Sequence, residues 1–250
     1  MTTDRQRAEH GGGSLVVLFG SKPGAGTSII AANLAIALGR LTAARVILFE
    51  GHYDLGNLAS LLDLAPERHI GQALSEVLAA GLLPHSSGIE VLLRAPDGTR
   101  PTPEQLRTLL GEARSLARYT VVDSALRYDA GFHLLLDEAD QLLMVATPEA
   151  TALRHGEQFL QQAEEWGVLP RLGVVVNRWE SESGVEPAQL RALFGARIVG
   201  RLPSDGRLAV EAGNAGRPFV LDASKQPLSQ AVFALAEWVH GQVVAERQPS

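Results

Sequence analysis

Residues 18–28 read Leu18-Phe19-Gly20-Ser21-Lys22-Pro23-Gly24-Ala25-Gly26-Thr27-Ser28. They continue an apolar run over residues 15–19, which is typical of a strand covered on both faces of a parallel sheet. Apolar residues between Ile29 and Leu38 then predict a helix that runs to about Leu41. A glycine-rich turn at the start of a helix presents backbone N–H groups that can surround an anion. The stretch predicts a phosphate-binding loop, although taken alone it also fits an ordinary tight turn.

The rest of the chain alternates between strand and helix patterns. Apolar runs of strand length occupy residues 46–49, 89–93, 119–123, 141–146, 172–176 and 197–202. Helical patterns occupy residues 70–80, 102–117, 149–165, 187–193 and 206–215, and a last helix begins at about Leu228. This alternation predicts an α/β fold with a doubly wound, mostly parallel sheet and helices on both faces. We expect one domain over residues 14–246 after a flexible tail over residues 1–13.

The composition excludes several classes of protein. The chain has 250 residues, 46% of them hydrophobic, which is enough for a full core. It has no cysteine, which excludes disulfides and thiolate chemistry, and its histidines lack the spacing of a metal site. A net charge of −6 argues against DNA as a partner. Because no apolar run is long enough to cross a bilayer and no signal-peptide pattern is found, we expect a cytoplasmic protein.

The last helix lacks the pattern of a membrane anchor. From Leu228 onward the chain has one lysine or arginine, Arg247. Apolar residues recur at helical spacing at Leu228, Val232, Leu235 and Val239. Such a stripe faces a protein core more often than a membrane. We therefore expect no autonomous membrane anchor.

Several residues of the opening stretch suit phosphate and magnesium chemistry. The usual phosphate-loop motif ends in Gly-Lys-Ser or Gly-Lys-Thr, whereas this chain has Gly26-Thr27-Ser28 and lacks that lysine. Ser28 stands where a hydroxyl would reach Mg²⁺, and Asp123, at the end of an apolar strand, stands where an acid would orient the ion's water. Lys22 is one of only two lysines among 22 basic residues, and a compact point charge suits a tight loop better than arginine does.

Residues 21–28 resemble the deviant phosphate loop of the ParA/MinD ATPases, which carry a signature lysine near the start of the motif. Lys22 matches that lysine, and Thr27 replaces the second, usual one. Within this superfamily the chain looks most like the CpaE/TadZ branch of pilus-assembly and polar-localisation proteins, whose loop often lacks the second lysine. The resemblance extends over residues 46–50, 56–64, 121–123, 146–149, 175–178 and 202–205. It implies the fold of P-loop NTPases.

The resemblance also implies a role for each matching residue. Lys22 would contact the phosphates bound by the opposite protomer of a nucleotide-sandwich homodimer. Asn177, Pro203 and Asp205 would hold the adenine, although without the family Asn177 reads as a strand end and Pro203 as the start of a turn. The phosphates of ATP would be held by Gly24, Ala25, Gly26, Thr27 and Ser28.

Three departures from the family pattern bear on hydrolysis. The family's second strand ends in Asp-x-Asp, whose second acid positions the attacking water, whereas this chain reads Glu50-Gly51-His52. Thr27 removes a charge that would stabilise the β- and γ-phosphates, and loss of one such group typically costs about 10²- to 10³-fold in rate. Pro23 replaces a glycine and removes one N–H donor. Nucleotide binding tolerates these changes better than fast hydrolysis does.

We therefore expect an ATP-binding protein that dimerises around ATP and Mg²⁺ and hydrolyses ATP weakly or not at all. Its role would be spatial positioning, or assembly of a pilus or secretion machine, through a protein partner that recruits it to a pole or to the cytoplasmic face of the membrane. One alternative is an active ATPase that uses Lys22 and His52, since a histidine can act as a general base near neutral pH. Asp123, behind the metal, is the third candidate catalytic residue. The other alternative is a nucleotide-free scaffold or interaction module.

Overall fold

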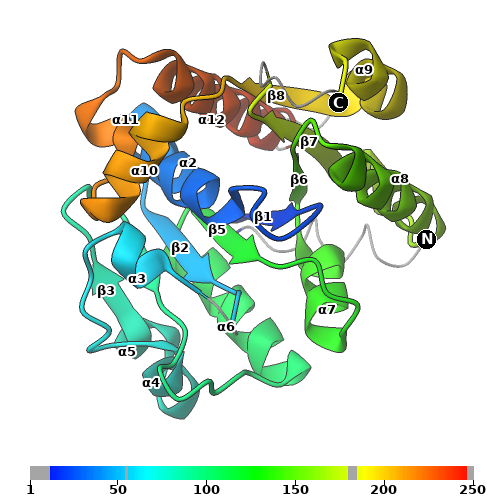
Figure 1. The fold of residues 1–250 in the computed structure, drawn as a ribbon. Coiled ribbons are helices and arrows are strands. Elements are labelled where there is room, and N and C mark those ends of the chain that lie inside the picture. Colours follow the sequence, from blue (N-terminus) through cyan, green and yellow to red (C-terminus); the bar gives the residue numbers. More distant parts are fainter. Residues whose placement is uncertain (1–11, 54–55, 180–184, 247–250) are drawn as a thin grey trace.

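The computed structural model describes residues 12–53, 56–179 and 185–246, and their core is one sheet (Figure 1). Its strands are β1 (Ser14–Gly20), β2 (Val46–Glu50), β3 (Leu82–Pro84), β4 (Glu90–Leu92), β5 (Tyr119–Ser124), β6 (Gln141–Ala146), β7 (Leu172–Asn177) and β8 (Ile198–Leu202). They pair in the order β3-β4-β2-β5-β1-β6-β7-β8. The strands from β4 to β8 in this order are parallel, and β3 is antiparallel to β4.

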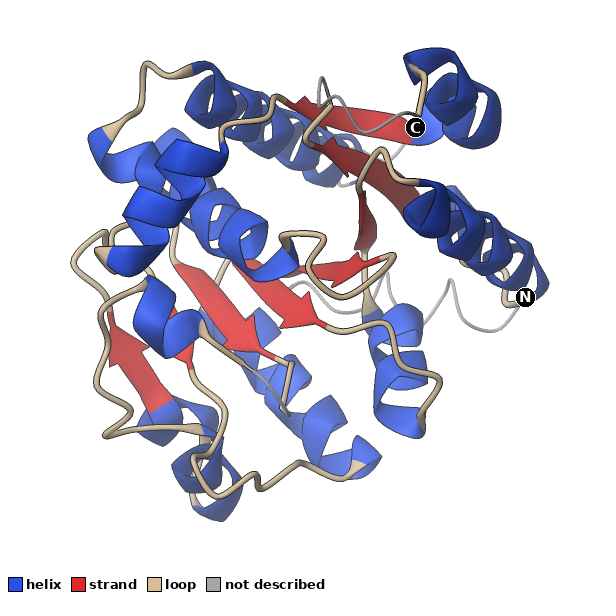
Figure 2. Ribbon diagram, in the orientation of Figure 1, coloured by secondary structure: helices blue, strands red, loops and turns tan. Residues whose placement is uncertain are grey.

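Helices cover both faces of the sheet (Figure 2). They are α2 (Thr27–Thr42), α3 (Leu58–Leu61), α4 (Ile70–Ser75), α5 (Leu78–Gly81), α6 (Pro103–Leu116), α7 (Ala130–Glu138), α8 (Ala150–Glu165), α9 (Pro187–Phe194), α10 (Gly206–Asn214), α11 (Phe219–Asp222) and α12 (Pro227–Glu246). Buried side chains form two clusters, one shared by α2, α3, α11 and α12, the other by α4 to α9. The predicted doubly wound α/β fold is confirmed.

Strand β1 lies in the middle of this sheet and contributes to both cores. Val16 and Leu18 pack toward α2 and α12, whereas Leu15, Val17 and Phe19 pack toward the opposite face. Because neighbouring strands are parallel, their carboxyl ends meet at one edge, and open α/β sheets bind ligands there. This places the turn after Gly20 beside the end of β5, with the end of β2 one strand further along the sheet.

The structure differs from the sequence prediction in several short elements, and helices α3 and α11 are among those that the sequence patterns did not predict. Strand β3 is a three-residue edge strand that ends at Pro84, too short to show a periodic pattern. The helix expected over residues 70–80 is two helices, because the chain turns at Glu76. Helix α7 lies between two predicted strands and begins after Asp129, whose side chain accepts a hydrogen bond from the Phe132 N–H.

Both ends of the domain can be compared with the prediction. Of the expected flexible tail, residues 1–11 lie outside the described residues, while Gly13 donates its N–H to the Arg114 carbonyl and accepts a bond from the Arg114 side chain. The apolar stripe of α12 faces the core as predicted, with Val232 and Val239 fully buried. In the part of the chain that the structure describes, no helix combines the length and apolar character needed to span a membrane.

Candidate functional site

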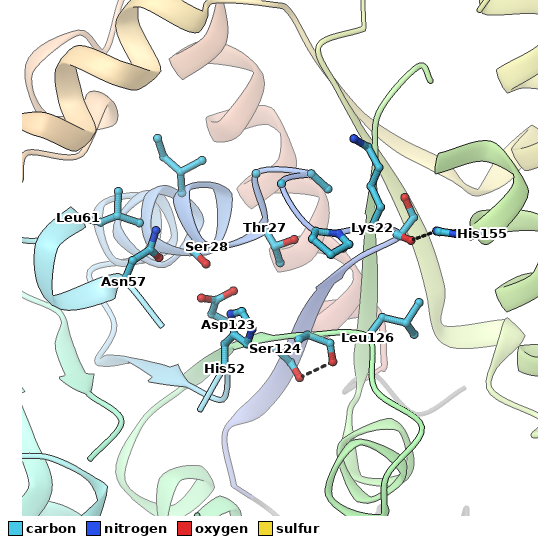
Figure 3. Close-up of a pocket in the computed structure, with 18 of the residues that line it drawn as sticks. Lys22, Thr27, Ser28, His52, Asn57, Leu61, Asp123, Ser124, Leu126 and His155 are labelled. Carbon is cyan, nitrogen blue, oxygen red and sulfur yellow. Dashed lines mark hydrogen bonds between the residues drawn. The ribbon is translucent and has the colours of Figure 1, made fainter. Parts of the chain in front are cut away.

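A cavity of about 790 Å³ opens at the carboxyl edge of the sheet (Figure 3). Its walls come from the turn between β1 and α2, the ends of β2 and β5, and helices α3, α8 and α10. The sequence-predicted site residues that line it are Lys22, Gly24, Ala25, Gly26, Thr27, Ser28, His52 and Asp123. Residues predicted from three separate segments of sequence are thus brought together around one space.

The turn from Gly20 to Ser28 has a backbone that depends on glycine. Gly24 and Gly26 have φ angles of 77° and 93°, in the left-handed region that favours glycine. A β-carbon on Gly26 would lie 2.5 Å from the Nδ2 atom of Asn177. That amide donates a 2.9 Å hydrogen bond to the Ala25 carbonyl, while its Oδ1 accepts the Arg178 N–H. Asn177 therefore supports the loop from the end of β7.

The three residues predicted to hold adenine are not among those that line the cavity. Asn177 contacts the loop itself, and the Asp205 carboxylate caps α10 by accepting the Leu208 N–H at 3.0 Å. Pro203 lies in the turn between β8 and α10. The cavity wall on this side is apolar instead, and its side chains belong to Ile29, Leu61, Ala209 and Val210. No sequence signal identified these four residues, because apolar side chains on α2, α3 and α10 resemble core residues.

The fit of a divalent cation rests on Asp123 and Ser28. Asp123 is 1% exposed, and its Oδ2 atom has no hydrogen-bond partner within the described ranges. Burial raises the pKa of this carboxyl to about 7, with Glu50 adding to the rise and a hydrogen bond from Ser28 opposing it. In Figure 3 the carboxylate faces the Ser28 hydroxyl. A buried oxygen without a partner beside a hydroxyl suits Mg²⁺, which prefers oxygen ligands and keeps several waters.

Lys22 is held at the rim of the cavity by an ion pair. Its ammonium lies 2.7 Å from the Oε2 atom of Glu149, directly before α8. The hydrogen bond from Lys22 is the main cause of a lowered pKa at the Glu149 carboxyl. In Figure 3 the Lys22 side chain points away from Thr27 and Ser28. The structure therefore separates the loop's lysine from the helix N-terminus where phosphates would bind.

Glu50 and His52 occupy the end of β2 but have different environments. The buried Glu50 carboxylate accepts two 2.9 Å hydrogen bonds, from the Leu58 N–H and the Arg94 N–H, and so joins the 51–57 loop to the end of β4. His52 lines the cavity, and burial is the main cause of its lowered pKa, with Arg127 and Arg94 also lowering it and Glu50 opposing them. A lowered pKa keeps the imidazole neutral at neutral pH.

Glu50→Gln should destabilise the fold by about 1–3 kcal/mol, because the amide keeps one acceptor oxygen and turns an NH₂ group toward the second backbone N–H. Urea unfolding of the variant and of the exposed control Glu67→Gln measures the difference. Equal midpoints for the two variants would show that the carboxylate contributes little to the fold.

Sequence comparison finds relatives over nearly the whole chain. The septum site-determining protein MinD of Synechocystis is 26% identical over 245 residues, 91% of this chain and 90% of that protein. An uncharacterized ATP-binding protein of Methanocaldococcus jannaschii is 25% identical over 240 residues, 91% of this chain and 88% of that protein. No protein-family model matches the chain.

Structure comparison gives the same extent of similarity. The MinC:MinD cell division protein complex of Aquifex aeolicus matches with a TM-score of 0.79 and 26% identity, over 91% of this chain and 96% of that chain. The similarity therefore covers the sheet and its helices and is not confined to the glycine-rich turn.

Proposed function

We propose that this MinD/ParA-like P-loop protein binds ATP with Mg²⁺ in the cavity around residues 20–28, and that two copies close around the nucleotide. The observation that carries the proposal is a glycine-dependent loop at a helix N-terminus beside a buried carboxylate whose Oδ2 has no protein partner among the described residues. The loop N–H groups would hold the phosphates, and Ser28 and Asp123 would hold the ion and its water. ATP is the nucleotide named for the Methanocaldococcus relative.

Within this function we propose weak or absent hydrolysis. Thr27 supplies no positive charge at the start of α2, and Pro23 supplies no N–H donor. Glu50 is committed to two backbone N–H groups and does not line the cavity. The loop therefore lacks groups that would stabilise negative charge developing on the γ-phosphate.

The competing proposal, an active ATPase, has one observation in its favour. His52 lines the cavity with a lowered pKa and so offers a neutral imidazole to an attacking water. Single-turnover hydrolysis with a stoichiometric amount of ATP separates the two. Turnover that disappears in His52→Ala supports the active enzyme. An ATP complex that persists without turnover supports weak or absent hydrolysis.

We assign the protein's output to positioning in the cytoplasm, as in the CpaE/TadZ branch. The nucleotide-bound dimer would present a surface to a protein partner of a polar, pilus or secretion assembly. The support is the loop pattern, with the signature lysine kept at Lys22 and the second lysine replaced at Thr27. Recruitment to a membrane would depend on that partner, because the apolar stripe of α12 is buried in the core.

Nucleotide binding itself is tested by calorimetry and thermal melting with ATP and Mg²⁺. A ligand at 100 times its dissociation constant stabilises the folded state by about 2.7 kcal/mol, which is a readily measured rise in melting temperature. Absence of both heat and stabilisation would instead identify a nucleotide-free interaction module.

Lys22→Ala should abolish the ATP-dependent dimer, because the variant removes the cation that would reach the partner's phosphates. Sedimentation velocity with and without ATP and Mg²⁺ gives the oligomeric state. The matched control is Lys225→Ala, which removes the chain's other lysine from an exposed position. A nucleotide-dependent dimer in Lys22→Ala would contradict the assigned role.

A further inference from the structure

Few side chains around the cavity can carry positive charge. Among the described residues that line it, these are Lys22, His52 and His155. Lys22 already pairs with Glu149, and Thr27 carries no charge where the usual lysine would stand. A nucleoside triphosphate brings several negative charges, so the backbone N–H groups of the loop must be well placed to hold its phosphates.

His155 reaches this site from α8 and contacts the phosphate loop directly. Its Nδ1 atom lies 3.2 Å from the carbonyl oxygen of Ser21, the residue before Lys22 (Figure 3). Ser21 is 1% exposed, and its own N–H donates to the Val145 carbonyl at 2.8 Å. A rigid carbonyl can only accept a hydrogen bond, so Nδ1 must carry the proton. This hydrogen bond therefore ties the start of the loop to α8.

We infer that His155 is a loop-positioning residue for a nucleoside triphosphate: its Nδ1–H holds the Ser21 carbonyl and so fixes the start of the loop whose N–H groups would surround the phosphates. The inference rests on the proposed nucleotide site. A loop held at Ser21 keeps its N–H groups where phosphates would bind, and a loop released there would lose that placement.

The test compares Mg-ATP, Mg-ADP and adenosine binding to the full chain and to two variants. His155→Ala removes the loop contact, and His155→Asn keeps an N–H donor near the Nδ1 position. The matched control is Gln158→Ala, which alters the cavity wall on the same helix without removing an ionisable group. Because the variant loses the hydrogen bond that positions the loop, His155→Ala should weaken Mg-ATP binding about 10-fold and leave adenosine binding unchanged.

The conservative variant separates loop positioning from a merely structural role. His155→Asn should recover most of the Mg-ATP affinity that His155→Ala loses, because it keeps the N–H donor. Equal Mg-ATP affinities of wild type and His155→Ala would overturn the inference while the proposed function stands. Equal losses of ATP and adenosine binding would also overturn it, because they indicate a merely structural residue. If the wild type itself binds no ATP, the proposed function and this inference fail together.

Discussion

Gly26→Ala should reduce Mg-ATP affinity by about 100-fold or more, while the sheet remains folded. The residue has φ 93°, where a side chain costs about 1–3 kcal/mol of strain. Its new β-carbon would also lie 2.5 Å from the Asn177 amide that supports the Ala25 carbonyl. To relieve the strain and the collision, the loop or the Asn177 amide must move. Either movement misplaces the N–H groups that would hold phosphates.

The chain contains a control that separates strain from collision. Gly24 also has a positive φ, 77°, but a β-carbon there meets nothing within 4 Å. Gly24→Ala should therefore show the strain effect alone and bind ATP more tightly than Gly26→Ala. The double variant Gly26→Ala, Asn177→Ala removes the collision and should recover part of the affinity. Wild-type binding by Gly26→Ala, measured by calorimetry, is the result that contradicts this account of the loop.

Asp123→Asn should stabilise the free protein at pH 8 and weaken its metal site. In the folded chain burial raises the carboxyl pKa to about 7, whereas the ordinary value is 3.8. Between these pH values the folded state holds a proton that the unfolded state has released, so the unfolding free energy decreases as pH rises from about 4 to about 7. Above pH 7 the unfolding free energy is lower by the full amount, which is at most about 4 kcal/mol. The amide of the variant does not ionise, so the variant does not lose this free energy.

Urea unfolding without nucleotide or Mg²⁺ measures this effect. At pH 8 Asp123→Asn should be more stable than wild type, and near pH 4 the two should converge. The control Asp97→Asn changes an exposed carboxyl whose pKa is lowered by hydrogen bonds from Thr99, and it should not stabilise the protein at pH 8. In Asp123→Asn, Mg²⁺ should also lose most of its effect on ATP binding. Parallel pH curves for wild type and Asp123→Asn would mean that the buried carboxyl imposes no such cost.

The sequence alone predicts the sheet and the loop because both have local signals. Apolar runs mark β1, β2 and β5, and glycines at positions 24 and 26 mark a turn that needs positive φ. Asp123 could be placed because parallel strands end at a common edge. The same reasoning misses β3, which has three residues, and α7, which begins at a cap that no preceding apolar pattern announces.

Contacts between distant segments are what the sequence does not reveal. His155 looks like one of several scattered histidines, and only the packing of α8 brings it to Ser21, 134 residues earlier. Likewise, a strand-ending asparagine gives no sign that its amide will bond the Ala25 carbonyl. The apolar wall at Ala209 and Val210 depends on where α10 rests, which neither periodicity nor motif spacing determines.

The strand register also has a consequence for how the chain folds. In the central ladder Ser14 lies opposite Tyr119, and Leu18 and Glu50 both lie opposite Asp123. Pairings between such distant segments close large loops and form slowly. A slip of one residue in β5 would turn Asp123 to the other face of the sheet. Nucleotide and metal should therefore bind only after the central strands have paired in register, so ligand binding can serve as a kinetic probe for the last steps of folding.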